Sequence, residues 1–325
     1  MKKAILVLLI ISYATVSGIS ISAQTENKYD AFAYRNLGAF RASAWVGSIA
    51  VPENPGEKFR YTFYVGSRNG GVWKTINNGT TFECITDGTG VSSVGDIAVA
   101  PSNPEVLWFG SGEAFNARLS TSGNGIWKSE DAGKTWKNMG LKDSHHIAKI
   151  VIHPSDHNTL WVASMGHLFT KNEERGIFKT TDGGLTWKKV LYTDDATGFI
   201  DLIINSKNPE ILYAASYEKI RTGWTYEAGG EKSRIYKTTD GGKTWKTLSG
   251  GLPQGPLGRI GIDLQRSNPE VLVAVIQNMN PKPGADLSKV IPFDPFTDHS
   301  FDNLIGGEVY RSDNGGNSWK RINDP

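Results

Sequence analysis

An eight-residue pattern recurs five times along the chain: Ser or Thr, any residue, Asp or Asn, any residue, Gly, any residue, Ser or Thr, and a closing Trp or Phe. Its best copy spans residues 238–245. The closing aromatic residues follow one another at steps of 54, 51, 58 and 74 residues. A period of about 50 residues is typical of proteins built from structural repeats. The defining positions are Asn77, Phe82, Asp131, Trp136, Asp182, Trp187, Asp240, Trp245, Asn314 and Trp319.

The residue types in this pattern predict a hairpin corner. An Asp or Asn side chain can accept hydrogen bonds from backbone N–H groups two residues on. The Gly at the fifth position can adopt positive φ without steric cost. A short β-like run such as residues 176–179 precedes each copy, and the closing aromatic residue can bury its ring between neighbouring sheets. Each copy should therefore join two antiparallel strands.

A second motif lies upstream of each corner: a β-branched run, a Pro/Asn/Ser turn and another apolar run, as in residues 96–108. Together the two motifs predict four antiparallel strands per unit, which is the signature of a propeller blade. The expected fold class is all-β, a β-propeller of four-stranded antiparallel blades. The chain would hold five blades, at 46–87, 92–140, 145–192, 198–249 and 257–323.

The N-terminal region predicts export. Lys2 and Lys3 precede an apolar run that is too short to span a bilayer, and small residues follow up to Ala23. Residues 1–23 are therefore expected to be a signal peptide, with the protein periplasmic, cell-surface or secreted, and of bacterial origin. Residues 24–45 form an N-terminal segment in which 34–38 resembles the last strand of a blade. Such a strand would close a ring that is incomplete here; the alternative is a complete five-bladed ring with a loose N-terminal strand.

The charge balance argues against two kinds of partner. Without residues 1–23, which hold two of the 35 basic residues, the chain has 33 basic and 33 acidic residues. A formal charge of zero argues against nucleic acid or an anionic membrane as the main partner. Cys84 is the single cysteine, so no internal disulfide can form. No cofactor and no metal is expected.

The repeated corner resembles the Asp-box, or bacterial neuraminidase repeat, of β-propellers. The chain as a whole, from about residue 30 to 323, is most similar to the N-terminal propeller of the sortilin family. Xyloglucanase-type and sialidase propellers are more distantly similar. The resemblance implies that the boxes are structural and lie away from any active site.

Function is therefore expected on the opposite face, where the long loops gather. Acidic, Arg and aromatic side chains there would suit a peptide, protein or glycan ligand. His145 and His146 with His167 could hint at a metal, but their spacing is not that of a regular ligand set. The expected ligand-binding residues are Arg68, Glu113, Asn116, Arg118, His167, Glu174, Arg221 and Trp224.

Two hypotheses of function follow. The leading one is a non-catalytic binding scaffold, and the alternative is a glycoside hydrolase, xyloglucanase-like or sialidase-like, acting on polysaccharide. Glycoside hydrolysis normally requires two carboxylates across the scissile bond. Similarity to xyloglucanases implies that one of them would stand in the segment 67–71, but the corresponding residue here is Arg68, which cannot serve as acid or base. The sequence thus favours binding and assigns no catalytic residue.

Overall fold

The computed structural model describes residues 45–114, 120–221, 226–286 and 303–323. All of them belong to one compact unit, Gly38–Pro325. The expected signal peptide and the ring-closing strand lie outside the described residues, and both stay predictions.

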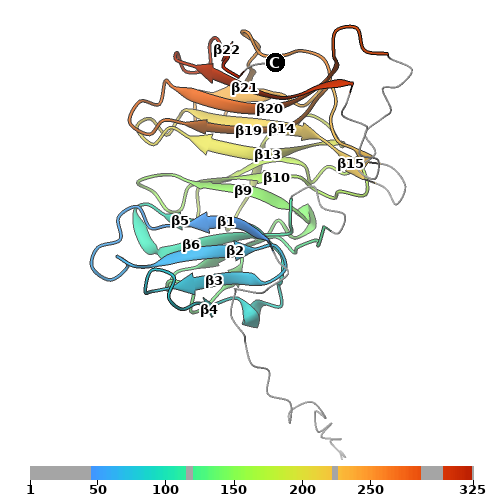
Figure 1. Ribbon diagram of the computed structural model, residues 1–325. Helices are drawn as coiled ribbons and strands as arrows, with labels where there is room; N and C mark the ends of the chain where they lie inside the picture. Colours follow the sequence, from blue (N-terminus) through green and yellow to red (C-terminus); the bar gives the residue numbers. More distant parts are fainter. Residues whose placement is uncertain (1–44, 115–119, 222–225, 287–302, 324–325) are drawn as a thin grey trace, which may run out of the picture. The chain divides into compact units, whose positions relative to one another are not determined.

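Five four-stranded antiparallel sheets follow one another along the chain (Figure 1), which confirms the all-β propeller fold with five four-stranded blades. Apart from the 3-10 turns Asp87–Thr89 and Lys142–Ser144, the described part of the chain contains no helix.

The strand bounds, blade by blade, are as follows. Blade 1 consists of β1 (Val46–Ala50), β2 (Phe63–Ser67), β3 (Gly71–Thr75) and β4 (Glu83–Cys84). Blade 2 consists of β5 (Val94–Ala100), β6 (Asn103–Ser111), β7 (Ile126–Ser129) and β8 (Lys137–Asn138). Blade 3 consists of β9 (Ile147–Ile152), β10 (Leu160–Ser164), β11 (Gly176–Thr180) and β12 (Lys188–Leu191). Blade 4 consists of β13 (Thr197–Ile204), β14 (Leu212–Glu218), β17 (Ile235–Thr238) and β18 (Lys246–Thr247). Blade 5 consists of β19 (Leu257–Leu264), β20 (Leu272–Pro281), β21 (Leu304–Ser312) and β22 (Lys320–Arg321). A small ribbon of β15 (Ile220–Arg221) and β16 (Tyr226–Glu227) is inserted in blade 4.

The first strands of successive blades, β1, β5, β9, β13 and β19, are neighbours in that order. These strands belong to different sheets, so no ladder of backbone hydrogen bonds joins them. Hydrogen bonds from backbone N–H groups to side chains connect them instead. Asp96 Oδ2 accepts a hydrogen bond of 2.8 Å from Ile150 N in the next blade, and Asp201 Oδ2 accepts one of 2.9 Å from Ile262 N. Lys149 lies between these two acids, and their negative charges raise its pKa. The inner strands are thus joined by buried polar groups as well as by apolar packing.

The Asp-boxes form hairpin corners with one common geometry. The Gly at the fifth position has φ between +85° and +90° in all five copies, as the sequence predicts. The fourth position also has positive φ, even where it is Asn78 or Ala132. The acid bonds differently from the expectation: Asp182 Oδ1 accepts from the backbone N–H of Thr186, four residues on, at 3.0 Å. The Thr180 hydroxyl, not the acid, bonds the N–H groups of the turn itself.

The boxes of blades 2, 3 and 4 are each hydrogen-bonded to the preceding blade. The indole nitrogen of Trp187 donates a hydrogen bond of 2.7 Å to Met139 O in blade 2, and that of Trp136 donates one of 2.8 Å to Ile85 O in blade 1. From the other side, Lys179 Nζ of blade 3 donates 2.8 Å to Gly241 O, inside the box of blade 4. The expectation that the closing rings pack between neighbouring sheets is therefore met at these two tryptophans.

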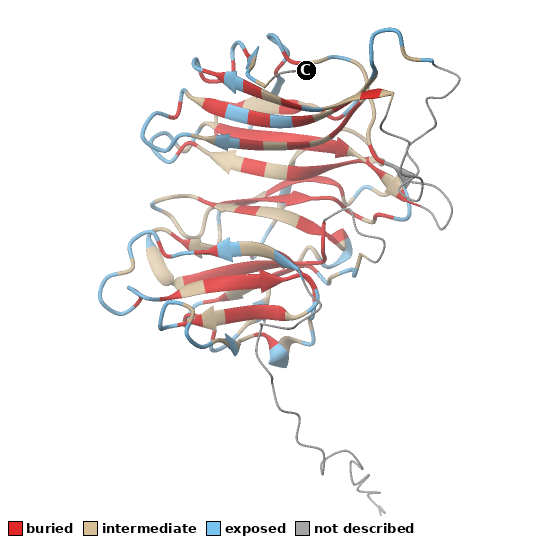
Figure 2. Ribbon diagram, in the orientation of Figure 1, coloured by how far each residue is buried: buried red, intermediate tan, exposed pale blue. Residues whose placement is uncertain are grey.

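Strands of the two end blades contain exposed positions (Figure 2), and some of these positions hold apolar residues. In blade 1, Ile49 is 60% exposed, whereas Ile97 and Ile150 of the next two inner strands are 3% and 4% exposed. In blade 5, Val275 is 53% exposed. Blades 2–4 are packed between neighbours on both faces, while blades 1 and 5 each pack on one described neighbour. The expectation that the five blades form part of a larger ring stays a prediction.

The box acids predict a pH dependence of stability. Hydrogen bonds from the hydroxyls of Thr186 and Thr180 and from the Thr186 N–H lower the pKa of Asp182 from 3.8 to about 2. A lowered carboxyl pKa stabilises the fold above the unfolded-state pKa, and that stabilisation is lost as pH falls through the folded-state value, between about pH 4 and pH 2.

We therefore expect Asp182→Asn to flatten the fall in melting temperature over this pH range. The substitution should retain the corner, because Asn77 makes the same bonds to the Thr81 N–H and the Thr75 hydroxyl in the box of blade 1. Melting temperatures of the parent and the variant from pH 7 down to about pH 2 test this. Superimposable pH profiles would contradict the role given to the carboxylate.

Candidate functional site

The two faces of the propeller carry different connections. On one face, the backbone N–H of the fourth box residue bonds the turn between the first two strands of its blade, as between Gly183 N and Asn158 O at 2.9 Å. The short turns and the boxes therefore share this face. The other face holds the connections between the second and third strands and between blades. We call it the loop rim, and it holds the candidate site.

A buried ion pair lies in the loop rim of blades 1 and 2. Arg68 Nε is 3.0 Å from Glu113 Oε2, and the two side chains are 10% and 0% exposed. Burial raises the pKa of Glu113, and the positive charge of Arg68 opposes that rise. The Arg68 guanidinium also lies 4.9 Å from the centroid of the Trp45 ring. The residue that stands where a catalytic acid would be expected is thus a buried structural partner of the nearest carboxylate.

Lys219, directly after β14, adds a second buried cation. Burial lowers its pKa to about 7, while the negative charge of Glu113 acts in the opposite direction. The positive charges of Arg259 and Arg221 lower it further. Basic groups from blades 1 and 4, Arg68 and Lys219, therefore lie near one buried carboxylate of blade 2, and Arg259 of blade 5 lies near Lys219.

Arg175 joins three loops of the rim. Its side chain is fully buried, and its guanidinium donates to four backbone carbonyl oxygens. The bonds to His167 O and Ala196 O are 2.6 Å and 2.9 Å, and the bond to Lys219 O is 3.1 Å. These contacts fix the loops of blades 3 and 4 relative to each other, so Arg175 is a positioning residue.

The histidines of the rim divide into two environments. His146 is 1% exposed, its Nδ1 is 2.9 Å from Glu113 O, and burial lowers its pKa to about 3. His145 instead stacks on His167, with ring centroids 3.7 Å apart and ring planes 13° apart. Asp143 lies beside this stacked pair.

The structure brings together only part of the predicted ligand-binding set. Arg68, Glu113 and Arg221 are buried in the cluster around Lys219. His167 belongs to the stacked pair, and Glu174 is partly exposed beside Arg175. The remaining predicted residues, Asn116, Arg118 and Trp224, lie outside the described residues. Lys219 was absent from the predicted set, because a lysine that follows an apolar strand carries no sign of burial in the sequence.

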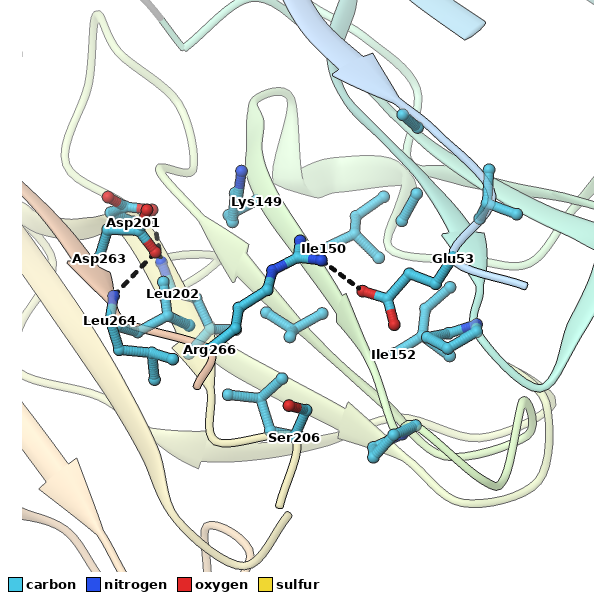
Figure 3. A pocket seen from close by; sticks show the side chains of 18 of the residues that line it. Glu53, Lys149, Ile150, Ile152, Asp201, Leu202, Ser206, Asp263, Leu264 and Arg266 are labelled. Atoms are coloured by element: carbon cyan, nitrogen blue, oxygen red, sulfur yellow. Dashed lines mark hydrogen bonds and ion pairs between the residues drawn. The ribbon is translucent and has the colours of Figure 1, made fainter. Parts of the chain in front are cut away.

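A separate cavity of about 480 Å³ lies along the inner strands (Figure 3). All five inner strands contribute to its wall, and its charged lining includes Lys149, Asp201 and Asp263. Arg266 of blade 5 lies 3.3 Å from Glu53 of blade 1 across this cavity, as measured between Nη1 and Oε1. Since both residues follow the ends of β19 and β1, this end of the cavity lies on the face of the short turns. It is therefore distinct from the loop rim.

Comparisons with known proteins agree with the fold. The sequence model described as Sortilin-Vps10, "Sortilin, neurotensin receptor 3", matches residues 124–257, which is less than half of the chain. Xyloglucanase Xgh74A of Acetivibrio thermocellus is 26% identical over 193 residues, covering 52% of this chain and 21% of the relative. A xyloglucanase of a Paenibacillus species is 23% identical over 194 residues, covering 53% and 17%. The chain thus spans about a fifth of the length of these curated relatives.

Solved structures give the same result. A GH74 enzyme of Niastella koreensis superposes with a TM-score of 0.59 at 21% identity, covering 85% of this chain and 38% of the enzyme. The GH74 xyloglucanase of Xanthomonas campestris gives 0.58 at 17% identity, covering 86% and 38%. Among the described residues, no helix is long and apolar enough to cross a membrane. The similarities in sequence and in structure therefore support a β-propeller fold for this chain.

Proposed function

We propose that this chain is an exported, non-catalytic binding module that holds a peptide, protein or glycan on its loop rim. The observation that carries the proposal is the Arg68–Glu113 pair. The position that resembles a catalytic acid is a cation, and the carboxylate beside it is fully buried. A buried, ion-paired carboxylate cannot reach a sugar ring. Arg68 and Glu113 therefore stabilise the structure of the rim.

The charge distribution of the rim supports a ligand that carries negative groups. Arg221, Arg259 and the acid Glu113 all lie near Lys219. Arg259 is the partly exposed member of this group, whereas the Lys219 and Arg221 side chains are buried. Arginine and lysine side chains recognise carboxylates through charge-assisted hydrogen bonds. Peptides with acidic side chains and acidic glycans both meet this requirement.

The alternative function is glycoside hydrolysis. It is supported by the similarity to xyloglucanases over about half of this chain. A hydrolase would need two carboxylates that face a common groove. Since the chain spans about a fifth of those relatives, the activity of the whole relatives does not transfer with the match.

A charge-reversal experiment tests whether the rim binds the ligand. Glu174→Lys changes a partly exposed rim residue, and Glu57→Lys changes a matched, 93% exposed side chain in the turn between β1 and β2. Both proteins are tested against acidic peptide and glycan arrays. Because rim charges act mainly on association, Glu174→Lys should alter binding of acidic ligands several-fold and Glu57→Lys should not. Equal effects of the two variants would contradict a ligand site on the rim.

A further inference from the structure

We infer that Asp143, His145 and His167 form a binding site for a divalent transition metal ion, zinc by preference, on the loop rim between blades 2 and 3. The inference is independent of the proposed function, because it concerns the ion alone. The three residues come from two connections: Asp143 and His145 follow β8, and His167 follows β10.

The donor atoms already lie at ligand-to-ligand distances. His167 Nε2 is 3.2 Å from Asp143 Oδ1 and 2.8 Å from the backbone oxygen of Asp143, and His145 Nε2 is 3.7 Å from Asp143 Oδ1. The three side-chain donor atoms lie within 4.8 Å of one another. Zinc bonds of 2.0–2.2 Å to nitrogen and oxygen in a tetrahedron separate neighbouring ligand atoms by about 3.3 Å. The two side-chain distances to Asp143 Oδ1, 3.2 Å and 3.7 Å, lie on either side of this value.

The chemistry of the set suits zinc. Two imidazoles and one carboxylate are a common ligand set for Zn²⁺, and such a site leaves a fourth position for water or a ligand. The side chains of Asp143, His145 and His167 are 73%, 36% and 24% exposed, so an ion can enter from solvent. The Asp143 carbonyl, which now accepts from His167 Nε2, is available as a fourth protein donor.

The backbone around the site is held in place. His167 O accepts hydrogen bonds from Arg175 Nη2 at 2.6 Å and from Asn172 Nδ2 at 3.1 Å. His145 has φ 57° and ψ −41°, an uncommon conformation for a non-glycine residue, and its carbonyl accepts a bond of 2.7 Å from Gly123 N. Residues with such unfavourable φ/ψ angles persist where the surrounding structure enforces them, and they are frequent at functional sites. Here it presents the imidazole of His145 to that of His167.

Metal binding requires one local adjustment. The two rings are nearly parallel, so their nitrogen lone pairs do not yet converge on one point. Rotation about χ2 of histidine is soft, and the exposed side of His145 leaves room for it. The stacked pair should therefore open when the ion binds, and His167 should change tautomer, with its proton on Nδ1 in place of Nε2 so that Nε2 can bind the ion.

The test is a zinc titration of the chelator-treated full chain by calorimetry at neutral pH. We expect one zinc ion per chain. His145→Asn, which suits positive φ, and His167→Gln, which can still donate to the Asp143 carbonyl, should each weaken binding at least about tenfold, since even loss of an outer-shell partner costs 10–100-fold. His157→Ala, at a partly exposed histidine in the turn between β9 and β10 on the face of the short turns, should bind zinc like the parent.

Melting temperatures separate lost binding from lost folding. Without zinc, all four proteins should melt alike; with zinc, only the parent and His157→Ala should gain stability, because a ligand stabilises the state it binds. The inference is wrong if the parent binds zinc no tighter than about 1 mM. It is equally wrong if His145→Asn and His167→Gln retain the parent affinity, because the ion would then be held elsewhere.

Discussion

Replacing Arg68 with alanine is expected to lower the free energy of unfolding by about 3–5 kcal/mol. The reason is the position of Glu113, which is fully buried and 3.0 Å from the Arg68 guanidinium. Removal of the cation leaves a carboxylate without its closest opposite charge in a place that water does not reach. The measurement is urea unfolding of the parent and the variant.

Two further variants show whether the loss comes from the buried charge. The double replacement Arg68→Met with Glu113→Leu removes both charges and should recover most of the stability, because apolar pairs of similar volume can replace buried ion pairs. Arg60→Ala removes an exposed partner of Glu57 and should cost no more than about 1 kcal/mol. If Arg68→Ala were as mild as Arg60→Ala, the pair would not be the structural element described here.

Replacing Trp187 with alanine is expected to cost about 3 kcal/mol of unfolding free energy. Its ring packs edge-on against Trp108 of blade 2, with centroids 6.4 Å apart, and its indole N–H donates to Met139 O. The substitution removes apolar contact between two blades and leaves that carbonyl without its donor. The loss of unfolding free energy would thus measure how much the closing aromatic residue of a box contributes to the contact between two sheets.

Leu185→Ala is the matched control for Trp187→Ala. Leu185 lies in the same box two residues earlier, and 72% of it is exposed. Its removal should change the free energy of unfolding by less than about 0.5 kcal/mol. Equal midpoints for the two variants in urea would show that the box does not link blades 2 and 3.

The sequence predicts the fold well because each repeat carries its own local signals. The fifth-position glycines and the terminal aromatic residues mark every corner, and a β-branched run marks every inner strand. The hydrogen bonds that dock one blade on the next could not be predicted from the sequence. Lys179 Nζ reaches Gly241 O of the next box, and a basic residue stands directly before each box. The recurrence of a basic residue before each box is visible in the sequence. The carbonyl that Lys179 bonds lies 62 residues away, and its identity depends on how the blades stack.

The candidate site was predicted only in part, for a physical reason. Loops that carry polar side chains can be recognised, but burial and pairing depend on tertiary contacts. Arg68 and Glu113 are 45 positions apart, and nothing in either loop indicates that they meet. His145 and His167 lacked a regular ligand spacing, yet the connections after β8 and β10 place their rings in contact. Proximity of this kind follows from the blade stacking and not from local sequence.

The proposal is that this propeller binds its ligand on the loop rim and does not cleave polysaccharide. Its most direct test is prolonged incubation of the purified chain with xyloglucan, followed by measurement of newly formed reducing ends against a protein-free control. We expect no increase above that control. Reducing ends that accumulate in proportion to protein concentration would contradict it and would establish the hydrolase alternative.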